Sequence, residues 1–467
     1  MLNDFLILMK SELVISVIIF LLLFIKVGKG MKNERLLPLV QFLLLANFIG
    51  GFFFNETGSL FGGLFTTNAL IAFQKSILSL GVYLISLLFA DWLKKTEHMP
   101  EFLILALSAL LGMFFMISSG SLLMFFLSLE LSTLPVAAMA NFDLEKKISS
   151  EASMKMILSS AFSSGILLFG ISLLYGATGT ISFAGIPAML DGSPLQILAV
   201  VFLFTAFAFK LSIVPFHLWT ADVYEGAPIA VSSFLSVISK GSIAFILMTA
   251  LYKVLGPMHE IWYNMVMILS IATMVIGNLF ALRQQNIKRF LAYSSIAQVG
   301  FILVGLSSNS TAGISSVVYF VLIYTFSNLA AFGVAGVISQ QTGKERIDDY
   351  KGLYQTNPFI SWVLALALFS LAGIPPTAGF FGKLFLITAG ASKGNYFFIT
   401  VAALNLIVSL FYYLRVIRAV FMDKNEQPIE KINMHPSTKL GMIICAAGIV
   451  LVGLLSWVYD YINQLSI

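Results

Sequence analysis

Long apolar stretches follow one another along the whole chain, separated by short polar segments. A bilayer core of about 30 Å needs about 20 apolar residues in helical conformation. Counted on that basis, the pattern predicts an all-α polytopic membrane protein with about 14 transmembrane helices. The expected spans are roughly 5–25, 36–54, 66–90, 102–117, 121–140, 152–176, 195–216, 228–252, 261–282, 290–306, 312–339, 358–391, 396–414 and 440–462.

Two of these spans are predicted to contain a broken helix. The stretch 358–391 is too long for one straight crossing and contains Pro375 and Pro376, and the span 195–216 contains Pro215 near its end. Proline removes a backbone N–H and so frees a helical carbonyl. The segments Phe209–Pro215 and Phe369–Pro375 share Phe, Leu and Pro at an offset of 160 residues. Corresponding broken helices in two halves of a chain are typical of transporter folds.

Composition agrees with a lipid environment and excludes much chemistry. Apolar residues make up 59% of the 467 residues, charged residues only 10%, and the mean hydropathy is +0.95. Soluble chains have roughly 25% charged residues, so water-soluble domains are excluded. One cysteine and four histidines are too few for an iron–sulfur cluster or a Cys/His zinc site, and no glycine-rich phosphate loop is present. We expect no cofactor or metal in this chain and no nucleic-acid partner.

The basic residues predict the topology. With an even number of crossings, nineteen Lys and Arg fall in loops on one side of the membrane and three on the other. Cytoplasmic loops are the Lys- and Arg-rich ones, so both termini are predicted on the non-cytoplasmic side. Because the loops are short and no transit peptide is evident, we expect a multi-pass protein of the bacterial inner (plasma) membrane.

Six charged residues lie well inside the predicted spans, away from their ends and from the first span, which Lys10 and Glu12 interrupt. Each costs about 2.5–3.5 kcal/mol at the centre of a membrane helix, so such residues mark functional sites by default. They are Lys75, Lys155, Lys210, Lys240, Lys383 and the single acid Glu130. Burial lowers the pKa of a lysine and a nearby carboxylate raises it, so lysines near one acid suit a proton path.

A structural interpretation is kept beside the functional one for several residues. Lys75 and Lys155 are also compatible with snorkelling or with a structural pair to Glu130. His217, just after Pro215, is either an interfacial histidine or a proton relay. Asp222 and Glu225 are expected to cap a short loop.

At this point the sequence resembles a known family. The stretch Phe209–Pro228, FKLSIVPFHLWTADVYEGAP, is similar to the signature of the subunit N family of proton-pumping NADH–quinone oxidoreductase, respiratory complex I. The related subunit M and Mrp antiporter subunits have a different ending to this loop, so the VYEGAP ending favours subunit N. Supporting stretches are Leu129–Pro135, Glu151–Lys155, Ser164–Gly170, Arg289–Gly300 and Ala372–Lys383.

The resemblance implies a fold of two inverted five-helix repeats, each with one broken helix. It implies N-terminal helices at 1–100, a first repeat at 101–254, a second repeat at 255–422 and a C-terminal helix at 423–467, all within a single transmembrane domain. It also implies a proton-transfer path through Glu130, Lys155, Lys210, Lys240 and Lys383, with His217 as an optional member. Lys75 belongs to none of the matching motifs.

The resemblance further implies a subunit of an H⁺-translocating NADH:quinone oxidoreductase that has no redox centre of its own. FMN, iron–sulfur clusters and the NAD site are then expected in partner subunits, quinone elsewhere in the complex, and other membrane-arm subunits as direct neighbours. The hydrophilic redox arm would act on the chain indirectly. Two alternatives stay open: a Mrp-type cation/proton antiporter subunit, and the membrane subunit of a related redox-driven, hydrogenase-like complex. A purely structural scaffold would not need buried lysines in broken helices.

Overall fold

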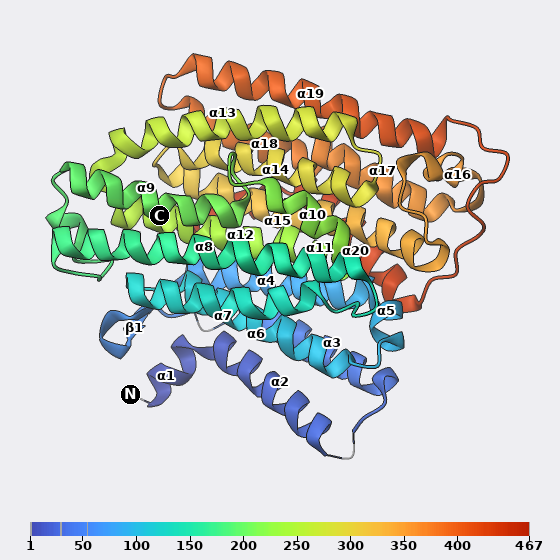
Figure 1. The fold of residues 1–467 in the computed structure, drawn as a ribbon, viewed down its shortest axis with the longest axis horizontal. Helices are drawn as coiled ribbons and strands as arrows, with labels where there is room; N and C mark the ends of the chain where they lie inside the picture. Colours follow the sequence, from blue (N-terminus) through green and yellow to red (C-terminus); the bar gives the residue numbers. More distant parts are fainter. Residues whose placement is uncertain (1, 29, 54, 467) are drawn as a thin grey trace.

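The computed structural model describes residues 2–28, 30–53 and 55–466 of the chain. Long helices run side by side along the longest axis of the molecule (Figure 1). Each of the fourteen predicted spans coincides with a helix or with a series of consecutive helices, so the all-α polytopic architecture is confirmed. Among the described residues, eleven helical segments are long and apolar enough to cross a bilayer, and α17 and α18 are shorter apolar helices.

The crossing elements, in chain order, are α2 (Lys10–Val27), α3 (Asn33–Gly50), α4 (Ala69–Leu88), α6 (Met99–Ile117), α7 (Leu122–Ala140), α8 (Lys147–Thr178), α9 (Pro194–Leu211) with α10 (Leu218–Gly226), α11 (Ile229–Phe234) continued by the π-helix η3 (Leu235–Ser239), α12 (Lys240–Thr249) and the π-helix η4 (Ala250–Val254), α13 (His259–Arg283), α14 (Ile287–Leu306), α15 (Thr311–Thr342), α17 (Pro358–Ala372) with α18 (Ala378–Ala391), α19 (Tyr396–Phe421) and α20 (Pro436–Leu454). Shorter elements are α1 (Leu2–Leu8), α5 (Ala90–Lys95), α16 (Leu353–Thr356), α21 (Ser456–Ser466), the antiparallel strands β1 (Gly58–Leu60) and β2 (Phe65–Thr67), and the 3₁₀ turns η1 (Phe61–Gly63), η2 (Ile186–Met189), η5 (Gly256–Met258) and η6 (Ile347–Tyr350).

Two groups of five crossings repeat the same sequence of elements. The crossings α6 to η4 and α13 to α19 each contain a 32-residue third helix, α8 or α15, followed by a broken fourth crossing. Both 32-residue helices end at a left-handed glycine, Gly179 or Gly343, which satisfies the last helical carbonyls. Because five is an odd number, the second group starts on the opposite side of the membrane and is inverted relative to the first.

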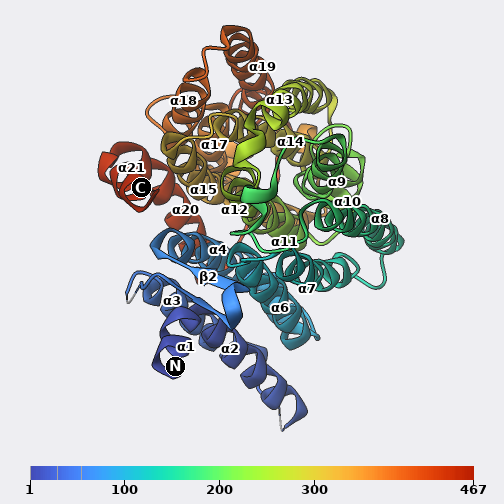
Figure 2. The same cartoon turned by 90° about the vertical axis from the view of Figure 1, so that its left-hand side faces the viewer.

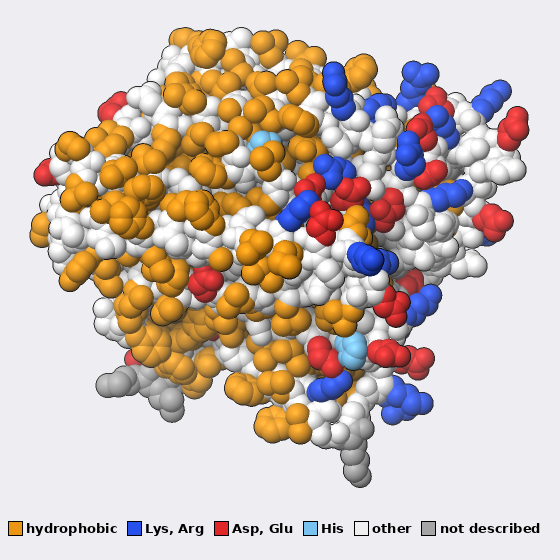
Figure 3. Space-filling view, viewed as in Figure 1, with side chains coloured by type: hydrophobic (Ala, Val, Ile, Leu, Met, Phe, Trp, Pro, Cys, Tyr) orange, Lys and Arg blue, Asp and Glu red, His pale blue; other side chains and the backbone are white. Residues whose placement is uncertain are grey.

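The helices are arranged as a buried centre and an exposed ring. The apolar window of α15 is 100% buried, whereas those of α8, α19 and α20 are 33% buried. Viewed end-on, α12 and α15 lie in the middle, with α8 and α19 at the outside (Figure 2). The outer helices present a broad apolar surface, as expected of helices that face lipid (Figure 3).

Charged side chains gather at one end of the bundle. Figure 3 shows Lys, Arg, Asp and Glu over the end where α5 and α16 lie, and an apolar surface over much of the rest of this face. The N- and C-terminal markers in Figure 1 both lie away from this charged end. This arrangement is the one that an even number of crossings requires.

Candidate functional site

The two broken helices have matching backbone geometry. Helix α9 ends at Leu211 because Ser212 adopts a left-handed conformation with φ of 63°, and α17 ends at Ala372 because Gly373 has φ of 83°. In each break the next residue, an isoleucine, donates its N–H five residues back along the helix.

This hydrogen bond fixes the alignment of the two repeats. Ile213 N–H bonds to the carbonyl of Ala208 at 2.8 Å, and Ile374 N–H bonds to that of Phe369 at 3.0 Å. The equivalent positions therefore differ by 161 residues, and the offset of 160 predicted from the shared Phe, Leu and Pro is wrong by one residue. Phe and Leu are so common in membrane helices that their identity aligned the wrong positions. At the correct offset, Lys383 takes the place that Asp222 occupies in the first repeat.

Lys210 lies in the last turn of α9 and is held by neutral oxygens. Its side chain is buried, and its Nζ lies 2.7 Å from the hydroxyl of Thr133 on α7 and 3.5 Å from that of Ser160 on α8. Glu130 lies one turn before Thr133 and accepts a hydrogen bond from Ser164 of α8. Glu130 and Lys210 thus share the wall formed by α7 and α8, and no ion pair between them is found within the described chain.

Lys155 does not pair with Glu130, contrary to the structural interpretation considered above. Its Nζ lies 2.6 Å from Asp222 on α10 and 2.7 Å from Glu151, and its side chain is 41% exposed. Lys155 is close to the start of α8, where the charged loops lie, and so its side chain reaches polar partners easily.

Asp222 and Glu225 do not cap a loop; both lie on α10 and bind Arg289 of α14. The guanidinium is 2.9 Å from Asp222 and 2.7 Å from Glu225. Together with Lys155 these residues form a polar network that joins α8 and α10 of the first repeat to α14 of the second. The sequence prediction placed Arg289 in a loop and missed this role.

Lys240 is the first residue of α12, directly after the π-helix η3. Its side chain is 3% exposed, and its Nζ donates to the hydroxyl of Ser295 on α14 at 2.8 Å. The ring of Tyr224 lies under the ammonium, with the ring centroid 5.7 Å from Nζ. Single turns of π-helix are found frequently at functional sites, because the extra residue re-aims the side chains that follow.

One face of α14 continues from Lys240 toward the second broken helix. Ser294, Ser295 and Gln298 lie within one turn of α14, and all three are buried. The hydroxyl of Ser294 is 2.6 Å from that of Tyr413 on α19, and the amide of Gln298 donates to the same Tyr413 hydroxyl at 3.0 Å. These polar side chains form a bridge inside the bundle.

The bridge ends at Lys383. The Gln298 amide donates to the carbonyl of Leu371 at 2.9 Å, and Lys383 Nζ donates to the same carbonyl at 2.6 Å. This carbonyl belongs to the end of α17, where the helix break removes its usual helical donor. The prediction that proline in this break frees a helical carbonyl is confirmed, and a lysine is one of the two donors that bind it.

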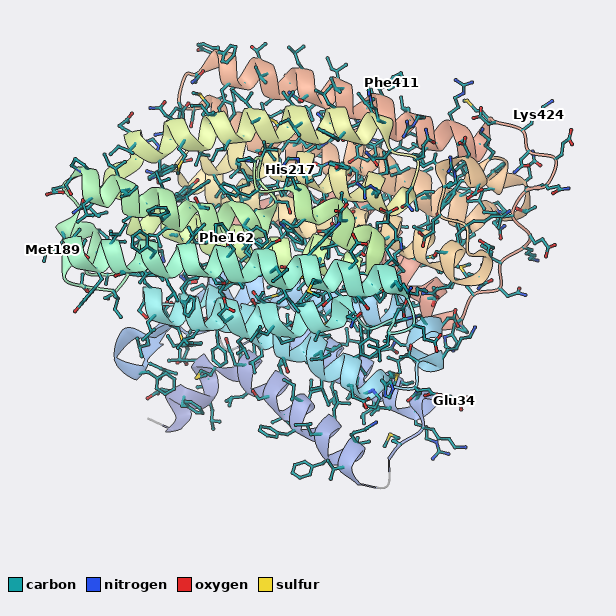
Figure 4. All side chains as sticks on the ribbon, viewed as in Figure 1. Glu34, Phe162, Met189, His217, Phe411 and Lys424 are labelled. Carbon is teal, nitrogen blue, oxygen red and sulfur yellow. The ribbon has the colours of Figure 1, made fainter. Side chains whose placement is uncertain are left out.

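His217 lies in the loop between α9 and α10, at the N-cap of α10 (Figure 4). Its side chain is 7% exposed, and its Nδ1 has no hydrogen-bond partner among the described residues. A neutral imidazole has one donor and one acceptor nitrogen, so this residue can exchange a proton with a water molecule in the break. Its position inside the bundle disfavours the interpretation as an ordinary interfacial histidine.

Lys75 has a buried partner that the sequence prediction missed. Its Nζ lies 2.6 Å from Glu12 of α2, with side chains 3% and 1% exposed. The alternative that Lys75 pairs with Glu130 is therefore wrong. The only hint in the sequence was that Lys10 and Glu12 interrupt the first span.

Inverted five-helix repeats, two broken helices and ionisable side chains at the breaks define an antiporter-like membrane subunit. Comparison with known proteins agrees. A family model described as NADH:quinone oxidoreductase/Mrp antiporter, transmembrane region, matches residues 119–409. The chain belongs to this family.

Within the family the chain is similar to subunit N of NADH-quinone oxidoreductase. The protein of that name from Phocaeicola vulgatus is 46% identical over 98% of both chains. A chain of respiratory complex I from Thermus thermophilus has a TM-score of 0.82 at 26% identity, covering 96% of this chain and 97% of that one. A chain of the Mrp complex from a Dietzia species has a TM-score of 0.86 at 20% identity over 98% and 96% of the two chains, which shows a shared fold.

Proposed function

We propose that this chain is a membrane-arm subunit of a proton-translocating NADH–quinone oxidoreductase and that its buried lysines carry protons. The high identity to subunit N along the whole length supports the assignment to this complex. The observation that carries the proton-transfer proposal is the row of buried polar side chains on α14. Ser295 accepts a hydrogen bond from Lys240, and Ser294 and Gln298 are joined through Tyr413 and the Leu371 carbonyl to Lys383.

The proposed path has three parts. Glu130 stabilises the charged form of Lys210 across the α7–α8 wall, and Lys155 connects this region to the polar network at the charged end. Water in the first break, with His217 as an optional relay, joins Lys210 to Lys240, because the two lysines share no direct hydrogen bond within the described part of the chain. Serine and tyrosine hydroxyls both donate and accept hydrogen bonds, so Ser294 and Tyr413 suit the last part toward Lys383.

The electron chemistry belongs to other subunits in this proposal. FMN, iron–sulfur clusters and the NAD site lie in the hydrophilic arm, and quinone is reduced elsewhere in the complex. Among the described residues no group of three or more His, Cys, Asp or Glu side chains is placed to hold a metal ion. The charged end faces the cytoplasm of a bacterium, and both termini face the opposite side of the plasma membrane.

Lys210→Met tests the proposal in the assembled complex. The neutral side chain has a similar length, so we expect normal assembly with a marked loss of protons moved per NADH oxidised in inverted membrane vesicles. Lys393→Met, at an exposed lysine after α18, is the control and should change nothing. Unchanged proton movement in assembled Lys210→Met complex would remove Lys210 from the mechanism. Assembly only with small membrane proteins, without redox partners, would favour the Mrp-type antiporter instead.

A further inference from the structure

A second buried ionic site lies outside the series of lysines described above. Glu12 and Lys75 pair between α2 and α4, at the end of the bundle opposite the charged loops. Both residues precede the region 119–409 that matches the family model. Lys75 is six residues into α4, about 9 Å from the start of that helix.

The buried Glu12–Lys75 ion pair lacks the additional hydrogen bonds that would make it a stabilising structural pair. A buried ion pair stabilises a fold only when further hydrogen bonds satisfy the remaining lone pairs. Neither carboxylate oxygen of Glu12 has a hydrogen-bond donor among the described residues, apart from the ammonium contact at 2.6 Å. The neutral form, carboxylic acid beside amine, therefore has a smaller energetic disadvantage than in a fully hydrogen-bonded pair.

Lys75 also lines a small pocket near the end of the bundle. The pocket is at the end where α1, the start of α2 and the β1–β2 hairpin lie. The polar part of its wall consists of Lys10, Ser11, Asn55, Glu56, Thr67 and Lys75. Glu56 is exposed, whereas the ring of Phe65 on β2 is buried, with its centroid 5.0 Å from Lys75 Nζ.

We propose that Glu12 and Lys75 form a proton-exchange site that opens through this pocket to the non-cytoplasmic side. The Lys75 ammonium, which lines the pocket, gives one proton to water there, and a proton that arrives from the interior binds to the Glu12 carboxylate, which leaves an amine beside a carboxylic acid. Transfer of the proton from the acid to the amine restores the ion pair. One proton enters and one leaves in each cycle.

Other titratable groups at this end set the local charge. Lys10 and Glu56 lie on the pocket wall, Asp4 lies on α1, and Tyr461 of α21 packs its ring against Phe73 of α4. The Lys10 side chain is held by the Asn55 side chain at 2.8 Å and by the carbonyl of Phe53. A fixed positive charge at the pocket wall favours release of a proton from the pair outward to water.

The test uses three versions of the full chain in the assembled complex. The neutral variant Glu12→Gln with Lys75→Met removes both charges and leaves no unpaired one. The swapped variant Glu12→Lys with Lys75→Glu keeps both titratable groups, and Lys393→Met is the control. We expect the neutral variant to lose protons moved per NADH oxidised, and the swapped variant to retain more of this ratio than the neutral one.

Equal ratios in the neutral and swapped variants would overturn the proposal, whether both are high or both are low. If the neutral variant fails to assemble, the swapped variant alone tests the proposal. It keeps both titratable groups, so the proposal requires that it still moves protons when NADH is oxidised. The inference rests on the proposed function, but the two fail separately. Loss of pumping in Lys210→Met with normal pumping in the neutral Glu12–Lys75 variant would reject only this second site.

Discussion

At the scale of single residues, the buried lysines of the broken-helix regions have neutral oxygens as partners. Lys210 is held by a threonine hydroxyl, Lys240 by a serine hydroxyl, and Lys383 by a backbone carbonyl. A neutral acceptor stabilises an ammonium less than a carboxylate does. These lysines can therefore release a proton at a smaller cost than Lys155, which contacts two carboxylates.

Tyr413→Phe tests the bridge between Lys240 and Lys383. The change removes the hydroxyl that joins Ser294 to Gln298, and the loss of these hydrogen bonds costs about 1 kcal/mol of stability. We expect normal assembly and slower proton movement relative to NADH oxidation in vesicles. Tyr350→Phe is the matched control, because Tyr350 is equally buried and its hydroxyl has no hydrogen-bond partner among the described residues. Equal pumping in the two variants would exclude Tyr413 from the path.

The sequence indicated the charged members of the site but not their partners. A lysine within an apolar span stands out because its cost in lipid is large. Serine, glutamine and tyrosine are common in membrane helices, so Ser295, Gln298 and Tyr413 carried no such signal. Only the packing of α12, α14 and α19 brings them together.

At the scale of elements, the positions of the crossings were predictable and their breaks nearly so. The spacing of apolar residues located every crossing, and the prolines located both breaks. The alignment of the two breaks was not predictable, because it depends on backbone turns at Ser212 and Gly373 rather than on shared side chains. The long helices α8 and α15 extend beyond the predicted spans into the polar loops.

Gly379→Ala tests the contact between the halves of the second broken crossing. A Cβ at Gly379 would lie 1.8 Å from the carbonyl oxygen of Ser370, so α18 would have to move away from α17. We expect a loss of stability of about 3 kcal/mol or more, measured as a lower thermal inactivation temperature and a lower yield of assembled complex. Gly165→Ala, on the exposed face of α8 with nothing within 4 Å, should have no such effect. Wild-type behaviour of Gly379→Ala would contradict the close packing of α17 and α18.

At the scale of the whole molecule, one ionic network connects the two repeats. Arg289 of the second repeat binds two acids of the first, and one of those acids also binds Lys155. Ordinary sequence patterns do not predict such a network, because its members lie more than sixty residues apart. Its place at the charged end positions α10 relative to α14, and so Tyr224 relative to Lys240.

Arg289→Ala tests the network. Removal of the guanidinium leaves Asp222 and Glu225 close together without their shared partner, so we expect about 1–2 kcal/mol of lost stability in thermal unfolding of the complex. The difference from wild type should shrink at high ionic strength, because these side chains are partly exposed. Arg418→Ala removes a more exposed pair with Asp423 and should change stability little. Equal effects of the two substitutions would argue against a special role for Arg289.

The partner of Lys383 has a consequence for how this protein can vary. The carbonyl of Leu371 belongs to the main chain, so no codon change at that position can delete it, and it does not titrate as a carboxylate would. Any residue at position 371 that preserves the break after α17 also preserves the carbonyl that binds Lys383. Natural variation is therefore expected to tolerate many side chains at position 371 and few alterations of the turn itself.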